Sequence, residues 1–489
     1  MGTISSAFSL ISSALDADQS ALSIVANNVA NANTTGYTLE TPNWQENSPV
    51  EINGISYGTG VTETGPTSVR DRVLDQRLEQ QQQLASASSS RLTALNSVQA
   101  LFTPDSGSSS ATAGDIGSDI SGFLSSFQAL EANPSSEVQR QDVLSSASTM
   151  ASDISGAAAS LNSQKSALDQ EASGVTSQVN ALTASIAQLN GQIQSTSPTS
   201  DAGTLEDQRQ QDLSQLSQLI GFNQITTENN GISITTPSGQ VLVSEGSSTP
   251  MTSGALDGAT HFFVGTTDVT TQLASGGGQL GGLLTARDQD IPAALASLDQ
   301  LAYGISTEVN AQNNAGTDLN GANGANIFSS DLQVSGSAAS MRVVMTDPNG
   351  IAAAASGQGT GDGANATAMY ALANENDPPM LDGLTLANGT TLTNGQTLLN
   401  GQTPTNFYSS FVTTLGSTVS EVQTENTAET ASVTQLQTQQ DSLSSVSLDD
   451  EASSLQVFER SYQAASQVFT ILNTLMNSAI NLGVSTAVS

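Results

Sequence analysis

Apolar residues recur at heptad spacing at both ends of the chain. Near the start, the N-terminal seam consists of Ile4, Phe8, Ile11, Leu15, Asp18, Leu22, Val25 and Val29, and all of these except Asp18 are apolar. Near the end, the C-terminal seam consists of Leu455, Phe458, Tyr462, Ala465, Phe469, Leu472, Met476 and Ala479. Intervals of three and four are typical of helices that pack side by side as coiled coils. No proline precedes Pro42 or follows Pro404, so each stretch can form one continuous helix.

The two seams have two possible kinds of partner. They could pack on each other within one monomer, as amphipathic helices commonly do. A lone pair of helices, however, buries too little apolar surface to be more than marginally stable once the entropy of ordering is counted. We therefore predict that the terminal helices are loose in the free subunit and that neighbouring copies complete both seams in a polymer.

Between the ends, the pattern predicts a mainly helical protein. Helices are expected over residues 71–102, 115–132, 135–194, 279–313 and from 407 onward. Residues 37–70 have the alternation and turn residues of extended chain, and residues 261–264 and 341–345 are rich in β-formers. The predicted fold class is mainly α with inserted β domains, in an elongated, nested multi-domain chain.

These changes of pattern also predict the domain boundaries. Residues 1–36 and 450–489 are expected to form a terminal coiled-coil inner domain. A mostly helical middle domain combines residues 37–221, 279–324 and 405–449. Residues 222–278 form a small β insert, and residues 325–404 form a second, β-rich outer insert.

The charge balance excludes several classes of partner. The chain has 10 basic and 45 acidic residues, a formal net charge of −35. Nucleic acids and anionic membrane surfaces both require a basic patch, which this composition cannot build. No basic leader is present, and no apolar run approaches the roughly 20 residues of a membrane-spanning helix. We therefore expect no nucleic-acid or membrane partner.

Candidate chemistry is sparse. The chain has no cysteine, and its single histidine, His261, stands beside two phenylalanines as a strand residue would. Residues 276–281 match a dinucleotide-binding glycine pattern but lack the flanking strands that would give the match meaning. Asp449, Asp450 and Glu451 fit the acidic first turn of a helix. We predict no catalytic residue, cofactor or metal ligand, and no enzyme activity.

Both ends resemble the bacterial flagellar axial proteins. The N-terminal motif combines residues 13–22 with a second run that includes Asn27, Asn28, Asn31, Asn33, Gly36 and Tyr37. The C-terminal counterpart covers residues 446–452 and 458–465. Interior segments are similar to the hook-associated protein 1 family, at residues 95–102, 127–140, 207–209, 281–284 and 318–321. The chain departs from that family at Leu39-Glu40, where Arg-Gln is usual, and at Ser445 and Ser447, where Gly and Asn are usual, so a salt bridge at Leu39-Glu40 is in doubt.

The resemblance implies a structural adaptor, assembled as a ring between the flagellar hook and the filament. The implied partners are the hook protein, a second hook–filament junction protein, identical subunits and a cytoplasmic export chaperone. It also implies an extracellular location in the flagellum, reached through the type III export apparatus without a cleaved signal. Two alternatives remain: another axial subunit, such as a hook or distal rod protein, or a surface module of the adhesin type.

Two groups of residues are therefore expected to carry function. The predicted assembly interface comprises Ile4, Phe8, Ile11, Leu15, Leu22, Val25, Val29, Leu455, Phe458, Tyr462, Phe469, Leu472 and Met476. The axial-family motif comprises Asn27, Asn28, Asn31, Asn33, Gly36 and Tyr37.

Overall fold

A computed structural model describes the chain at residues 2–34, 36–52, 55–103, 115–197, 202–256, 258–376, 384–386, 390–391 and 398–485. The chain divides into two compact units. The first unit contains Met1–Ser86, Thr176–Gly278 and Ala428–Ser489, and the second contains Ala87–Val175 and Gln279–Thr427. The described residues are mainly helical, with small antiparallel sheets, so the predicted fold class is confirmed.

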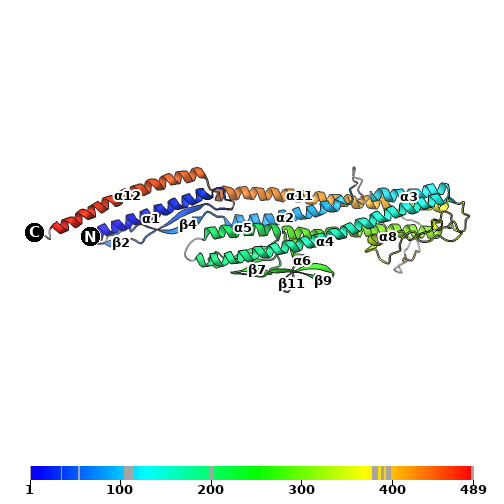
Figure 1. The fold of residues 1–489 in the computed structure, drawn as a ribbon, viewed down its shortest axis with the longest axis horizontal. Coiled ribbons are helices and arrows are strands. Elements are labelled where there is room, and N and C mark those ends of the chain that lie inside the picture. The colour runs from blue at the N-terminus through cyan, green and yellow to red at the C-terminus, as the bar shows by residue number, and fades with distance from the viewer. Residues whose placement is uncertain are drawn as a thin grey trace. The chain divides into compact units, whose positions relative to one another are not determined.

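The terminal helices form an antiparallel pair in the first unit. Helix α1 spans Gly2–Asn31 and helix α12 spans Leu448–Ser485, and Figure 1 shows them side by side with both chain ends at the same end of the pair. The rings of Phe8 and Phe469 meet edge to face with centroids 4.9 Å apart. We call this pair the terminal hairpin. Asp449, Asp450 and Glu451 occupy the first turn of α12, as the sequence predicts.

An extended segment follows α1 and packs against it. Strand β1 (Glu40–Glu46) pairs antiparallel with β4 (Val61–Ser68), and both strands contact α1. Two shorter strands, β2 (Val50–Ile52) and β3 (Ile55–Tyr57), pair with each other between them. Trp44 on β1 also reaches α12, where its ring lies 5.8 Å from that of Phe458. The extended chain predicted over residues 37–70 is therefore present.

The rest of the first unit combines helices with the first β insert. Helix α5 (Gly203–Leu219) accompanies parts of α2 (Arg72–Ala100), α4 (Glu137–Thr196) and α11 (Pro404–Ser444). One sheet contains β5 (Asn223–Thr226), β6 (Ile232–Thr235), β7 (Val241–Ser244) and β8 (Ser247–Ser248) in that order. The other contains β11 (Thr267–Asp268), β10 (Ala259–Val264) and β9 (Met251–Leu256), before the short helix α6 (Thr270–Gly276).

Two asparagines of α4 attach these sheets to the helix. Asn190 donates to the carbonyls of Ile232 and Glu245, each at 2.7 Å, and accepts from the Ile232 N–H. Asn180 both donates to and accepts from the Met251 backbone at 2.8 Å. A buried amide that satisfies backbone groups at a strand end fixes the position of that strand.

The first three glycines of the run at residues 276–281 serve close packing in the first unit. Gly277 has a φ of 101°, which favours glycine, and a Cβ on Gly278 would lie 2.4 Å from the Ile220 backbone. His261 lies on β10, where its Nδ1 is 2.6 Å from Asp268 Oδ2. His261 therefore lies in a strand, as its sequence context predicts.

The second unit is built on helix α3 (Ile116–Ala132), the part of α4 up to Val175 and helix α8 (Ile291–Ala315). A short helix α7 (Gly278–Thr285) and a π-helical turn (Ala286–Asp290) lead into α8. The core contains Phe123, Phe127 and Phe328. The ring centroid of Phe123 lies 5.4 Å from that of Phe127 and 5.5 Å from that of Phe328. All three side chains are fully buried.

The second insert differs from its predicted β-rich composition. The described residues of 325–404 contain two short α-helices, α9 (Ser337–Ser340) and α10 (Ala364–Ala371). They form isolated β-bridges, such as Phe328 with Val343, but no continuous β-strand. The Ser329 N–H donates to the Arg342 carbonyl and the Val344 N–H donates to the Ile327 carbonyl, each at 2.9 Å, and side chains of α8 bind further backbone groups of the insert. Asn310 Oδ1 accepts from the Ile327 N–H at 2.8 Å, and Asn313 Oδ1 accepts from the Ala352 N–H at 2.8 Å.

Candidate assembly site at the terminal hairpin

The predicted seams meet within one chain, but only in part. Val25 is buried, and five seam members are half-buried: Phe8, Ile11, Leu15, Leu22 and Leu472. Phe458 and Phe469 are half-buried too, because they pack on aromatic rings. Four others are exposed by 38–45 % of their surface, namely Val29, Leu455, Tyr462 and Met476. The side chain of Ile4 lies outside the described part of the chain.

Helix α12 also carries an exposed apolar row that the sequence analysis missed. Val457, Val468, Ile471 and Leu475 are exposed by 62, 42, 59 and 55 %. The last three follow the same intervals of three and four as the C-terminal seam, so the signal was present as a second heptad register on one helix. Large side chains exposed in a row mark a surface that is normally covered by another protein.

The axial-family motif places Asn28 at the base of the terminal hairpin. Its side chain is 1 % exposed and makes four hydrogen bonds. Nδ2 donates to the Glu40 carbonyl at 2.8 Å and to Glu451 Oε2 at 3.1 Å. Oδ1 accepts from the Tyr37 hydroxyl at 2.8 Å and from the Glu40 N–H at 3.1 Å. One amide therefore joins α1, the start of β1 and the first turn of α12, and we call this group the Asn28 joint.

Other motif residues shape the turn that follows α1. Asn31 donates to the Asn27 carbonyl at 3.0 Å and to Asn27 Oδ1 at 2.6 Å, while Asn33 is exposed. Gly36 has a φ of 79°, and a Cβ there would lie 2.6 Å from Gln211 Nε2. The positive φ therefore favours glycine, whereas the flexible side chain of Gln211 would have to move to admit a Cβ.

Electrostatics at this turn are dominated by buried acids. The pKa of Tyr37 is raised well above its usual value, first by burial and then by the negative charges of Glu40, Asp207 and Glu451. Its hydroxyl therefore stays protonated and remains a donor to Asn28. Glu451 is 7 % exposed, so the acidic first turn of α12 contributes one carboxylate to the interior of the joint.

A second polar connection joins the turn to α5. The Thr38 N–H and hydroxyl donate to the two carboxylate oxygens of Asp207 at 3.1 and 2.7 Å, and the Arg70 guanidinium also donates to that carboxylate. The pKa of Asp207 is raised, because the effect of burial exceeds the opposing effects of Thr38 and Arg70. Arg72 pairs with the neighbouring Glu206 at 3.1 Å. Asp207 belongs to the 207–209 segment of the family resemblance, and this contact gives it a structural role.

The departure at Leu39-Glu40 is accommodated through the backbone. The Leu39 N–H donates to the Ser444 carbonyl at 2.9 Å, and the Val69 N–H donates to the Leu39 carbonyl at 2.8 Å. Asn28 holds Glu40 by its peptide groups. The connection between α1 and its surroundings therefore does not depend on a basic side chain at this point.

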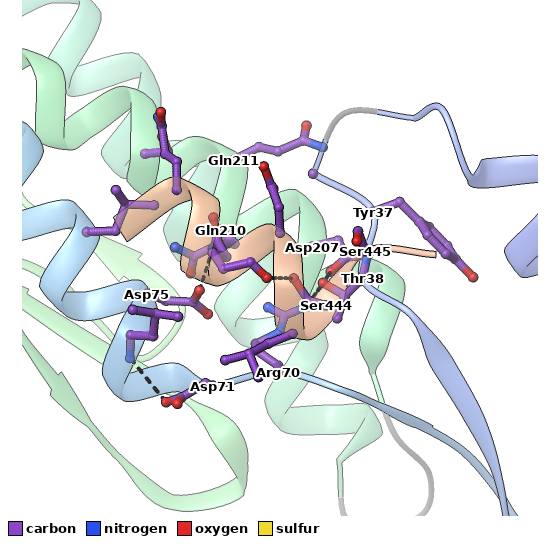
Figure 2. Close-up of a pocket in the computed structure, with 18 of the residues that line it drawn as sticks. Tyr37, Thr38, Arg70, Asp71, Asp75, Asp207, Gln210, Gln211, Ser444 and Ser445 are labelled. Atoms are coloured by element: carbon purple, nitrogen blue, oxygen red, sulfur yellow. Dashed lines mark hydrogen bonds and ion pairs between the residues drawn. The ribbon is translucent and has the colours of Figure 1, made fainter. Parts of the chain in front are cut away.

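These contacts border a polar cleft of about 650 Å³. It lies between the end of α1, the start of α2, α5 and the end of α11, and Figure 2 shows Tyr37 pointing away from the other labelled side chains. Asp75 accepts from Gln440 Nε2 at 2.5 Å, and Glu79 accepts from Gln210 Nε2 at 2.8 Å. Burial raises the pKa of Glu79 to about 7. These carboxylates already have donors, and no cluster suited to a metal ion occurs among the described residues.

Comparisons with known proteins find similarity to flagellar proteins in two segments and along nearly the whole chain. A sequence model described as the flagellar hook-associated protein FlgK helical domain matches residues 105–328, and one described as the flagella basal body rod protein matches residues 11–38. The proteins named flagellar hook-associated protein 1 from Escherichia coli (strain K12) and Salmonella typhimurium are 24 and 26 % identical, each covering 96 % of this chain and 98 % of its own length. The chain is similar to flagellar hook-associated protein 1 along nearly its whole length.

A third relative and a solved structure are also similar to this chain. The flagellar hook-associated protein 1 of Bacillus subtilis (strain 168) is 26 % identical over 96 % of both chains. A solved structure titled the flagellar hook junction protein FlgK from Burkholderia pseudomallei matches with a TM-score of 0.63 and 18 % identity, over 75 % of this chain and all of that one. The resemblance expected from the sequence is confirmed. The rod-protein match covers most of α1 and the turn after it, including Asn28 and Tyr37.

In the part of the chain that the structure describes, no helix has the length and hydrophobicity needed to cross a membrane.

Proposed function

We propose that this chain is a structural subunit of the bacterial flagellum that joins the hook to the filament. Its similarity to flagellar hook-associated protein 1 over 96 % of its length supports this role. The match of residues 105–328 to the FlgK helical domain favours a junction subunit over a hook or rod subunit. No observation favours the adhesin-like alternative.

Assembly through the terminal hairpin is the finer part of this proposal. The observation that supports it is the exposed apolar row of α12, where Val468, Ile471 and Leu475 leave about half of their surface uncovered in the single chain. Copies packed side by side in a ring would cover this row and the exposed members of the seams, among them Tyr462 and Met476. The predicted assembly residues therefore act between copies as well as within one hairpin.

The hook protein, the second junction protein and identical copies are the proposed partners. The subunit is placed outside the cell, after export through the flagellar type III apparatus. A cytoplasmic chaperone would cover the apolar row of α12 before export, because a row of that kind otherwise promotes aggregation.

Deletion of the gene tests this function. Cells that lack the subunit should build hooks, release unpolymerised filament protein into the medium and fail to swim, and the wild-type gene should restore filaments. Electron microscopy of the cells and quantification of filament protein in the medium measure both outcomes. Normal filaments on the deletion strain would overturn the proposal.

A further inference from the structure

The charged residues of the terminal hairpin are few and unevenly placed. Between Gly2 and Asn31, helix α1 has only two charged residues, Asp16 and Asp18. Helix α12, after its acidic first turn, has only Glu459 and Arg460. Arg460 is the single basic side chain in the two helices.

These four residues lie at one level of the hairpin. Contacts near its two ends set the register: Phe8 meets Phe469, and Asn28 meets Glu451. In sequence, Asp18 is midway between Phe8 and Asn28, and Arg460 is midway between Glu451 and Phe469. Asp16 and Glu459 lie within two residues of this level, or about 3 Å along a helix. We call Asp16, Asp18, Glu459 and Arg460 the charged belt.

Arg460 has no ionic partner among the described residues of its own chain. Its side chain is exposed. Phe458 and Tyr462 belong to the seam that faces α1, and Arg460 is two residues from each, so it projects about 200° away from that seam. Asp18 is 8 % exposed, whereas Asp16 is exposed on the outer surface of α1. On α1, the acid accessible to another molecule at this level is therefore Asp16, whereas on α12 the exposed acid is Glu459, next to Arg460 itself.

The surfaces around the belt would not fix a register by themselves. The exposed positions of α1 on either side of Asp16 are uncharged: Leu10, Ser12, Gln19 and Ser23. The exposed residues of α12 around Arg460 combine apolar Val457 and Val468 with the uncharged polar side chains of Gln456, Gln463 and Gln467, and Glu459 is the other charge there. Two such faces can pack at several axial offsets with similar contact area, as coiled coils do unless a polar residue selects one.

We propose that Arg460 of one copy pairs with Asp16 of the adjacent copy and thereby fixes the axial register between neighbouring terminal hairpins. The inference rests on the proposed function, in which copies pack side by side. Neighbours at the same axial level bring the outer face of one α1 against the outer face of the next α12. The only exposed charge on that part of α1 then meets the only cation of α12.

Charge reversal tests the pair in cells. Arg460→Asp and Asp16→Arg should each reduce swimming and increase released filament protein roughly tenfold, because each places like charges opposite one another. The double variant Asp16→Arg/Arg460→Asp restores opposite charges and should return both measurements close to wild type. A matched control, Glu459→Arg/Arg460→Asp, keeps the net charge but turns the cation about 100° around the helix and should stay defective.

Cross-linking tests the contact directly, because the natural chain has no cysteine. Asp16→Cys/Arg460→Cys, treated with a short bis-maleimide reagent in isolated hook–filament junctions, should give a ladder of linked subunits. Either single variant should give no ladder. Wild-type swimming by both single reversals, or a defect that the double reversal does not repair, would overturn the pair. Normal filaments on the deletion strain would instead overturn the proposed function, so the two failures are distinguishable.

Discussion

Replacement of Asn28 by Asp measures how firmly the Asn28 joint holds the terminal hairpin. The change preserves shape but replaces the Nδ2 donor by a carboxylate oxygen. That oxygen would lie beside the Glu40 carbonyl and Glu451 Oε2, which now accept from Nδ2 at 2.8 and 3.1 Å. Two like charges at 4 Å repel by about 4 kcal/mol at an effective dielectric constant near 20. The loss of two hydrogen bonds adds roughly 1 kcal/mol each.

The expected result is local separation of the hairpin base. Hydrogen exchange should accelerate at the end of α1 and the first turns of α12, while α3 and α8 in the second unit should exchange as in wild type. Asn28→Asp/Glu451→Gln should recover part of the protection, because the new amide can donate to Asp at position 28 and one negative charge is gone. The second opposing acceptor, the Glu40 carbonyl, remains.

Asn27→Asp is the matched control. Asn27 is exposed, and its carbonyl and side-chain oxygen only accept from Asn31 one turn later. An added negative charge there should change exchange little. If Asn28→Asp exchanges like wild type at both helix ends, the joint does not hold the hairpin. If Glu451→Gln shows no coupling to Asn28→Asp, the contact between α1 and α12 is not energetically significant.

Three further predictions concern other parts of the molecule. Phe469→Asp removes the edge-to-face contact with Phe8 and should abolish swimming while it leaves the main thermal transition unchanged. Ala465→Ser is the near-silent control, and a large fall in Tm for Phe469→Asp would place the helix in the monomer core. Arg140→Ala leaves the carbonyls of residues 134 and 351 without their buried donor and should lower the free energy of unfolding by about 2–4 kcal/mol in a denaturant titration. Burial raises the pKa of Glu308 from 4.5 to about 8, so between these pH values the folded chain holds a proton that the unfolded chain has lost. The free energy of unfolding should therefore fall by on the order of 4 kcal/mol as pH rises from 5 to 9, and Glu308→Gln should remove this fall.

Sequence alone determined the helices and the apolar seams that depend on periodicity. The terminal heptads, the absence of proline and the acidic first turn of α12 are local properties, and they were enough to predict two long helices and the C-terminal seam. The axial-family motif was likewise readable, because its residues lie within one short stretch of sequence. The role of its central residue was not, since the partners of Asn28 include Glu451, more than four hundred residues later.

Tertiary structure decided what the local pattern left open. Whether Val468 and Ile471 are covered depends on which face of α12 meets α1, and a helix with two adjacent apolar registers does not specify that choice. The second insert shows the same limit. Residues 341–345 have strand composition, but amides of α8 such as Asn310 satisfy nearby backbone groups that a ladder would otherwise pair. Backbone hydrogen bonds must be satisfied, and whether strand or side chain satisfies them is settled only when distant segments meet.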